Sequence, residues 1–132
     1  MRLGVAAAVV DGELVRGDVE IDGGTITAAG RRGGGRGIAV PGLVDLQVNG
    51  FAGVDLLQAT KEEVALVAAA LARTGVLWYQ PTLITAPPEL TRLALSTIGD
   101  AAEGPGARVL GVHLEGPFLA PARAGAHPVE WL

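Results

Sequence analysis

Glu115 is the acidic residue whose position best suits catalysis, because it ends a strand expected over Ala107–Glu115. A carboxylate at such a strand end is costly to bury unless it is paired or bound to a cation. Two interpretations follow from the residue itself. Glu115 is either a metal ligand or general base, or a salt-bridged glutamate at the lip of the strand.

The chain has two histidines. His127 lies in a loop between Gly125 and Pro128, where it either contacts a substrate or is an ordinary exposed loop residue. His113 precedes Glu115 by two positions and is interpreted as a hydrogen-bonded core histidine. Cysteine is absent, and a catalytic zinc typically needs three protein ligands, so the metal-ligand set of these 132 residues is poor.

Strands and helices alternate after Pro41, which favours parallel βα units. The expected elements are strands at Ile38–Asn49, Val76–Thr82 and Ala107–Glu115 and helices at Thr60–Thr74 and Ala86–Glu103. The first helix opens with a capping box from Thr60 to Glu63, and the second has prolines in its first turn. In a parallel βα sheet, ligands bind at the carboxyl ends of the strands.

Side-chain periodicity predicts which side chains share a face. Period two places Asp45, Gln47 and Asn49 on one face of the first strand, opposite Val44, Leu46 and Val48. In the third strand it places Val109, Gly111, His113 and Glu115 on one face and Leu110, Val112 and Leu114 on the other. The expected apolar helix faces are Val64, Val67, Ala68 and Leu71, and Leu90, Leu93, Ala94 and Ile98.

The segment Leu3–Ala29 is predicted to form a small β-sheet. Turn signals at Asp11-Gly12, Arg16-Gly17 and Asp22–Gly24 separate short apolar runs and are typical of hairpins. The glycine- and arginine-rich stretch Gly30–Gly37 is interpreted as a flexible connector, since it lacks the spacing of a phosphate-binding loop.

Composition indicates a globular chain without nucleic-acid or membrane partners. The chain is 49% hydrophobic and 18% charged, which is enough for a buried core, and its net charge is −4 without a basic stripe. Neither a signal peptide nor a membrane span is recognised. We expect a cytoplasmic protein, with which the absence of cysteine is compatible.

Two motifs, in order and at matching spacing, carry a resemblance that covers nearly the whole chain. The run from Pro41 to Gly50 resembles the first barrel strand of the amidohydrolase superfamily, with Gln47-x-Asn49 where other members have a His-x-His metal pair. The segment His113–Phe118, followed by Gly125–Pro128, is similar to a motif of the N-acetylglucosamine-6-phosphate deacetylase family. The stretch Gln80–Thr85 also matches that family.

This resemblance implies an α/β fold. It would be the N-terminal part of a TIM-type (β/α)8 barrel, preceded by one portion of a composite β-sandwich. Residues 1–40 would form the β-rich segment, and residues 41–132 the first βα units of an incomplete barrel, ending after about three strands. Such an open sheet is expected to be unstable alone or to associate.

The resemblance also implies site residues. Glu115 would be the carboxylate ligand of a single divalent metal ion, zinc or iron, and His127 would reach the acetamide carbonyl. Ala126 would contact the sugar through its backbone. Gln47 and Asn49 would replace the ligands of a second metal. Two further histidine ligands, a catalytic aspartate and the phosphate-binding residues are expected outside these 132 residues.

The implied reaction is hydrolysis of N-acetylglucosamine 6-phosphate to glucosamine 6-phosphate and acetate. The metal would polarise the carbonyl and activate a water, and His127 would stabilise the oxyanion. A homodimer is implied at full length. Three alternatives stay open: action on the galactosamine epimer, a dihydroorotase-like hydrolase, which Gln47-x-Asn49 disfavours, or a non-catalytic product.

Overall fold

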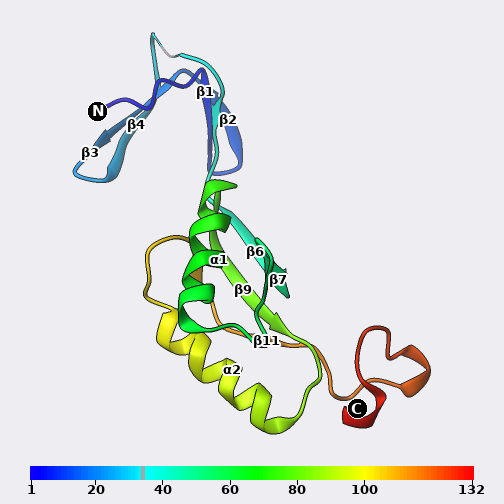
Figure 1. Cartoon of the computed structure of the whole chain (residues 1–132). Helices are drawn as coiled ribbons and strands as arrows, with labels where there is room; N and C mark the ends of the chain where they lie inside the picture. The colour runs from blue at the N-terminus through cyan, green and yellow to red at the C-terminus, as the bar shows by residue number, and fades with distance from the viewer. Residues whose placement is uncertain (34) are drawn as a thin grey trace. The chain divides into compact units, whose positions relative to one another are not determined.

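The computed structural model describes residues 1–33 and 35–132, in two compact units, Met1–Pro41 and Gly42–Leu132 (Figure 1). Across these described residues, every helix is too short or too polar to cross a lipid bilayer.

The N-terminal unit consists of five short strands in two open sheets. They are β1 (Ala7–Val10), β2 (Glu13–Arg16), β3 (Asp18–Asp22), β4 (Thr25–Arg31) and β5 (Ile38–Ala39). β1 is the middle strand of one sheet and pairs antiparallel with β2 and parallel with β5. β3 and β4 form an antiparallel hairpin. The region forms β-structure as expected, but in two small sheets rather than one.

Two of the three predicted hairpin turns are present. Asp11 and Gly12 both have positive φ angles, 51° and 83°, and join β1 to β2. Gly23 and Gly24 join β3 to β4 in the same way. The third prediction is wrong, because Gly17 is a corner between β2 and β3, which lie in different sheets.

Asp18 anchors this unit. Its side chain is 2% exposed, and one carboxylate oxygen accepts hydrogen bonds from the backbone N–H groups of Gly4, Val5 and Val19 at 2.8–3.1 Å. Burial by itself raises the pKa of the Asp18 carboxyl, but these three donors and the charge of Arg2 together lower it below its ordinary value. The charged carboxylate therefore joins the first residues of the chain to β3.

Parts of the glycine- and arginine-rich stretch are hydrogen-bonded within the N-terminal unit, and the expectation of a flexible connector stays a prediction. Gly30 and Arg31 belong to β4, and the N–H groups of Gly35 and Arg36 donate to the carbonyl oxygens of Val5 and Gly4. A Cβ atom at Gly35 would lie 2.1 Å from the Gly4 oxygen, so close backbone approach requires glycine there. Gly34 lies outside the described residues.

The second unit is built on a parallel sheet. Its strands are β6 (Leu43–Val48), β9 (Val76–Leu83), β10 (Arg108–Val109) and β11 (His113–Leu114). β9 is central and pairs in parallel with β6 on one side and with β10 and β11 on the other. A short hairpin of β7 (Gly50–Phe51) and β8 (Val54–Asp55) follows β6, and two 3-10 turns, η1 (Pro121–Arg123) and η2 (Val129–Trp131), follow β11. The described sheets are open and form no closed barrel.

Two expected strands are interrupted. The strand expected over Ile38–Asn49 is two strands, β5 and β6, because β5 pairs within the N-terminal unit while β6 pairs with β9. The strand expected over Ala107–Glu115 breaks at Leu110–Val112, around Gly111 with its φ of 147°. The predicted alternation is therefore wrong here, since Val109 and Val112 both pack against the same core.

Helices α1 (Lys61–Arg73) and α2 (Pro88–Ala101) connect the parallel strands. The predicted capping box of α1 is present: Thr60 Oγ1 accepts from the Glu63 N–H, and the Glu63 carboxylate accepts from the Thr60 N–H. The predicted face of α1 is buried as expected. The predicted face of α2 is partly wrong, because Leu93 is 64% exposed and Ala101 is buried in its place.

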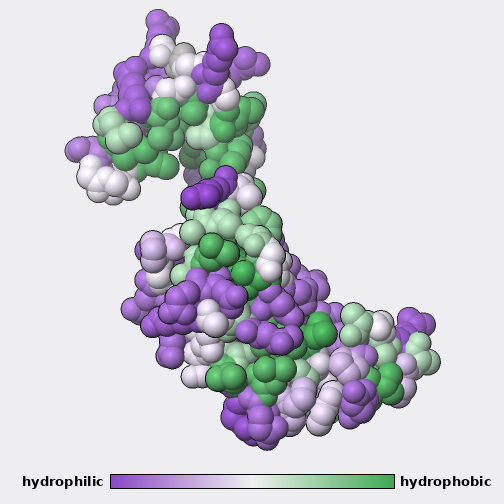
Figure 2. Space-filling model, in the orientation of Figure 1, coloured by the Kyte–Doolittle hydropathy of each residue, from purple (hydrophilic) through white to green (hydrophobic). Residues whose placement is uncertain are grey.

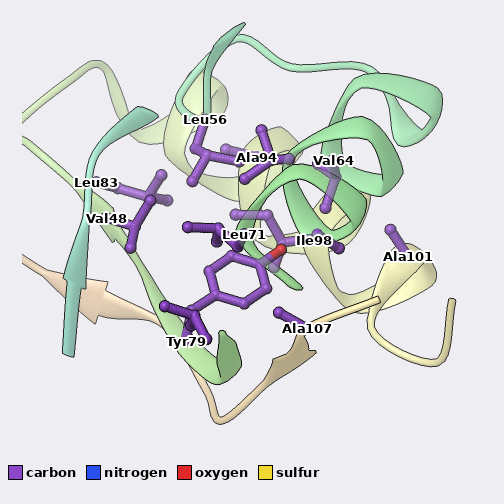
Figure 3. Close-up of a cluster of buried hydrophobic side chains, with 13 residues drawn as sticks. Val48, Leu56, Val64, Leu71, Tyr79, Leu83, Ala94, Ile98, Ala101 and Ala107 are labelled. Atoms are coloured by element: carbon purple, nitrogen blue, oxygen red, sulfur yellow. The ribbon is translucent and has the colours of Figure 1, made fainter. Parts of the chain in front are cut away.

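A single core lies between the two helices and β9 (Figure 3). Tyr79, on β9, is fully buried in its centre, and α1, α2, β6 and the segment before β10 supply its neighbours. In the described residues the Tyr79 hydroxyl has no hydrogen-bond partner, and burial raises its pKa. The ring therefore contributes apolar contacts rather than a polar anchor.

Apolar side chains remain exposed on the strands of the second unit, and Figure 2 shows hydrophobic surface on both units. β6 is an edge strand, and its Val44 and Leu46 are 51% and 63% exposed, whereas Val48 is buried. The others are Leu43 on β6, Phe51 on β7, Leu77 and Trp78 on β9 and Leu114 on β11. An uncovered edge with this composition favours association.

Asp18 should make the N-terminal unit sensitive to acid. Because the folded-state pKa lies below the unfolded value of about 3.9, the carboxylate stabilises the unit above that pH and ceases to do so as pH falls through the folded pKa. Asp18→Asn should weaken the protection of backbone amides in β1 and β3 against hydrogen exchange near neutral pH. In the variant, this protection should also fall less as the pH is lowered. The exposed Asp22→Asn is the matched control, and equal effects of the two changes would contradict this role.

The exposed strand β6 should drive self-association. Val44→Lys with Leu46→Lys places two charges on one face of an edge strand and should shift the 132-residue chain toward monomer in light scattering. Leu93→Lys, on the exposed face of α2, is the control and should leave the distribution unchanged. A wild-type chain that is monomeric at high micromolar concentration would refute the prediction.

Candidate functional site

The candidate site is an open hollow of about 840 Å³ in the second unit. It lies where β6, β9 and β11 end, and the β7–β8 hairpin and the segment Leu119–His127 complete its wall. Carboxyl ends of parallel strands meet at one edge of a sheet, which is where ligands bind in such folds. Its polar lining includes Gln47, Asn49, Asp55, Thr82, Glu115, Arg123 and His127.

His127 is the most enclosed of the predicted site residues, with 8% of its surface exposed. Its backbone N–H donates to the carbonyl oxygen of Ala124 at 3.0 Å, which positions it just after the turn η1. Its Nδ1 receives the backbone N–H of Thr85 at 3.2 Å and lies 2.8 Å from the Thr85 hydroxyl. His127 is therefore held against the end of β9, and is not an ordinary exposed loop residue.

Glu115 lies beside His127 in the lining of the hollow. Glu115 Oε1 lies 3.6 Å from His127 Nε2, and the glutamate side chain is 36% exposed. The Glu115 backbone N–H donates to the carbonyl oxygen of Leu83 at 2.9 Å, so the end of β11 is joined to the end of β9. Glu115 and His127 are not adjacent in sequence. They lie close together because both are hydrogen-bonded to residues at the end of β9 or just after it.

The other predicted residues lie in or beside the hollow. Ala126 is exposed on its wall. Gln47 and Asn49 both line it, and the Asn49 amide donates to the Thr82 carbonyl oxygen at 3.3 Å, which joins β6 to β9. His113 does not line the hollow, and its Nδ1 contacts the Thr82 hydroxyl at 3.3 Å.

The described residues do not form a metal centre by themselves. Within residues 1–33 and 35–132, no three His, Cys, Asp or Glu side chains gather closely enough to hold a metal ion. Glu115 is one carboxylate, and a catalytic zinc site needs three protein ligands. A resident metal ion thus does not fit this set of residues alone.

Two functional candidates, Thr85 and Gly116, were not predicted from the sequence. Thr85 follows β9 and is 7% exposed, and its polar atoms contact His127 and the Glu115 carbonyl oxygen. Gly116 has a φ of 88°, and a Cβ atom there would lie 2.3 Å from the Thr85 hydroxyl. A threonine before Ala86-Pro87 and a glycine after Glu115 are sequence signals for turns only, so their contacts needed the tertiary structure.

Curated relatives are similar along most of the chain, whereas no protein-family model matches it. N-acetylglucosamine-6-phosphate deacetylases of Rattus norvegicus and Homo sapiens are each 42% identical and align with 92% and 89% of the chain. The N-acetylgalactosamine-6-phosphate deacetylase of Escherichia coli O157:H7 is 41% identical over 68% of it. The chain spans about a third of the length of the mammalian relatives, 34% and 32%.

Solved structures agree with the curated relatives. The N-acetylglucosamine-6-phosphate deacetylase of Thermotoga maritima superposes with a TM-score of 0.83 at 30% identity. The superposition includes 99% of this chain and 36% of the Thermotoga maritima chain. A mutant of the Mycobacterium smegmatis enzyme, solved in complex with N-acetyl-D-glucosamine-6-phosphate, gives a TM-score of 0.80 at 28% identity with the same coverage.

Gly116→Ala should disturb the site. The new Cβ atom would clash with the Thr85 hydroxyl and lie 3.4 Å from His127 Nδ1, in addition to left-handed backbone strain of about 1–2 kcal/mol. Gly53→Ala has a similar φ, 83°, with no atom within 4 Å of its Cβ, and controls for that strain. Urea unfolding should show a larger loss of stability for Gly116→Ala, with a shift of the His127 ring resonances. Equal losses and unmoved resonances would contradict the contact.

Proposed function

Because this chain is homologous to the N-terminal third of the N-acetylglucosamine-6-phosphate deacetylases, we propose that it contributes part of a deacetylase site for N-acetylglucosamine 6-phosphate. The proposal concerns a protein of the relatives' length, in which this chain supplies Glu115, His127 and Ala126. The single observation that carries it is the approach of Glu115 to His127, 3.6 Å apart, in the hollow at the strand ends.

The chemistry assigned to His127 is hydrogen-bond donation. Its Nδ1 is occupied by Thr85, and its Nε2 lies 3.6 Å from Glu115 Oε1 in the lining of the hollow, so we assign the Nε2–H as the donor to an acetamide oxygen bound there. As water adds to the carbonyl carbon, negative charge develops on that oxygen, and a preorganised donor stabilises it. The C–N bond then breaks, the amine takes a proton, and acetate and glucosamine 6-phosphate leave.

Glu115 is proposed as a ligand of a divalent metal ion in the protein of family length. Its carboxylate is partly exposed toward the hollow, which a metal ligand requires. The remaining ligands, the catalytic acid and the phosphate contacts must come from residues other than those described here. The 132-residue chain is therefore proposed to be inactive alone, and a homodimer at family length is part of the same proposal.

The galactosamine epimer is the second candidate substrate. An N-acetylgalactosamine-6-phosphate deacetylase is 41% identical to this chain, close to the 42% of the glucosamine enzymes. Both substrates present the same acetamide to Glu115 and His127, so these residues do not discriminate between them. Comparison of kcat/KM for the two epimers would decide.

Acetate release tests the proposal directly. The 132-residue chain should show no turnover with added divalent metal, whereas the same chain extended to the relatives' length should release acetate. Glu115→Gln in the extended protein should lower kcat by at least about a hundredfold, since even a residue that only supports a metal ligand costs ten- to a hundredfold. Asp55→Asn, also in the wall of the hollow, is the charge-matched comparison and should cost far less.

Two results would overturn this assignment. Turnover by the purified 132-residue chain would show that its own residues suffice. An extended protein that is folded and metal-loaded but inactive on both epimers would show that the substrate class is wrong, and would favour a non-catalytic role.

A further inference from the structure

The contact between Thr85 and His127 determines which ring nitrogen carries the proton. A backbone N–H can only donate, so the Thr85 N–H at 3.2 Å requires a lone pair on His127 Nδ1. A proton on Nδ1 would face the Thr85 amide proton. In a neutral ring the proton must then be on Nε2.

The Thr85 hydroxyl is compatible with the same arrangement. Its oxygen lies 2.8 Å from Nδ1, and at that distance two lone pairs would repel each other. Because the Thr85 N–H already requires a lone pair on Nδ1, the hydroxyl proton points at Nδ1 rather than at the Glu115 carbonyl oxygen, which is farther away at 3.4 Å. One residue thus presents two donors to one acceptor nitrogen.

Thr85 is itself held in place. It is 7% exposed and follows the end of β9, whose Leu83 carbonyl oxygen is bound by the Glu115 N–H. Gly116 lies against the threonine, where any larger side chain would collide with the hydroxyl. The donors therefore occupy a fixed position relative to both Glu115 and His127.

We propose that Thr85 is a positioning residue that holds His127 in the tautomer with its proton on Nε2 and directs that N–H into the hollow. This inference deepens the proposed function and rests on it for its consequence in catalysis. The tautomer itself is a property of this chain and can be measured without substrate.

Nitrogen-15 spectroscopy of the imidazole rings reads the tautomer directly. The chain has only two histidines, so His113 serves as an internal reference, and spectra in the solid state remain usable if the chain associates. In the wild-type chain, the His127 proton should be found on Nε2. A proton found mainly on Nδ1, or on both nitrogens equally, would overturn the proposal.

Substitutions distinguish the effect of the Thr85 hydroxyl on the tautomer from an effect on folding. Thr85→Val keeps the shape and the backbone donor but loses one hydrogen bond, so the ratio of the two His127 tautomers should fall about three- to tenfold. Thr85→Ser should restore it. Thr82→Val removes the equivalent hydroxyl from His113 and should alter His113 alone. A tautomer ratio unchanged by Thr85→Val would refute the role of the hydroxyl.

Activity of the extended protein gives the second readout. Thr85→Val should lower kcat about tenfold and leave KM within about twofold, because the donor acts on charge that develops after binding. Thr85→Ser should recover most of the rate. An inactive wild-type extended protein with the expected tautomer would refute the proposed function alone, whereas an active one with the wrong tautomer would refute this inference alone.

Discussion

Burial of one face of β9 beneath α1 and α2 is the interaction on which the second unit depends. Tyr79 lies at the centre of that face, fully enclosed by apolar side chains of both helices and of neighbouring strands (Figure 3). Close-packed contacts of this kind leave the strand little room to shift. Since β9 pairs with every other strand of the sheet, its position sets theirs.

The end of β9 determines the geometry of the candidate site. Leu83 binds the backbone of Glu115, Thr82 accepts a hydrogen bond from Asn49, and Thr85 binds the ring of His127. Three separate segments are thereby held at one edge of the sheet. A rigid strand with several hydrogen bonds at its end is a more accurate scaffold for such residues than loops alone.

An incomplete metal-ligand set is consistent with how sites at strand ends are built. In barrels of parallel strands, catalytic residues come from the ends of several different strands. The described residues hold Glu115 and His127 together at such strand ends without forming a metal centre. The N-terminal unit is stabilised independently, through the buried Asp18 carboxylate and its three backbone donors.

The sequence by itself determined the features that depend on neighbouring residues and on local periodicity: the capping box at Thr60, the hairpin at Asp11-Gly12, and the alternation of strands and helices. Its motifs also indicated the family and singled out Glu115 and His127. Tertiary structure alone decided the break at Gly111, the exposure of Leu93 and the contact of Thr85 with His127. These depend on which distant surfaces meet and on hydrogen bonds across 42 residues of sequence, which local patterns do not encode.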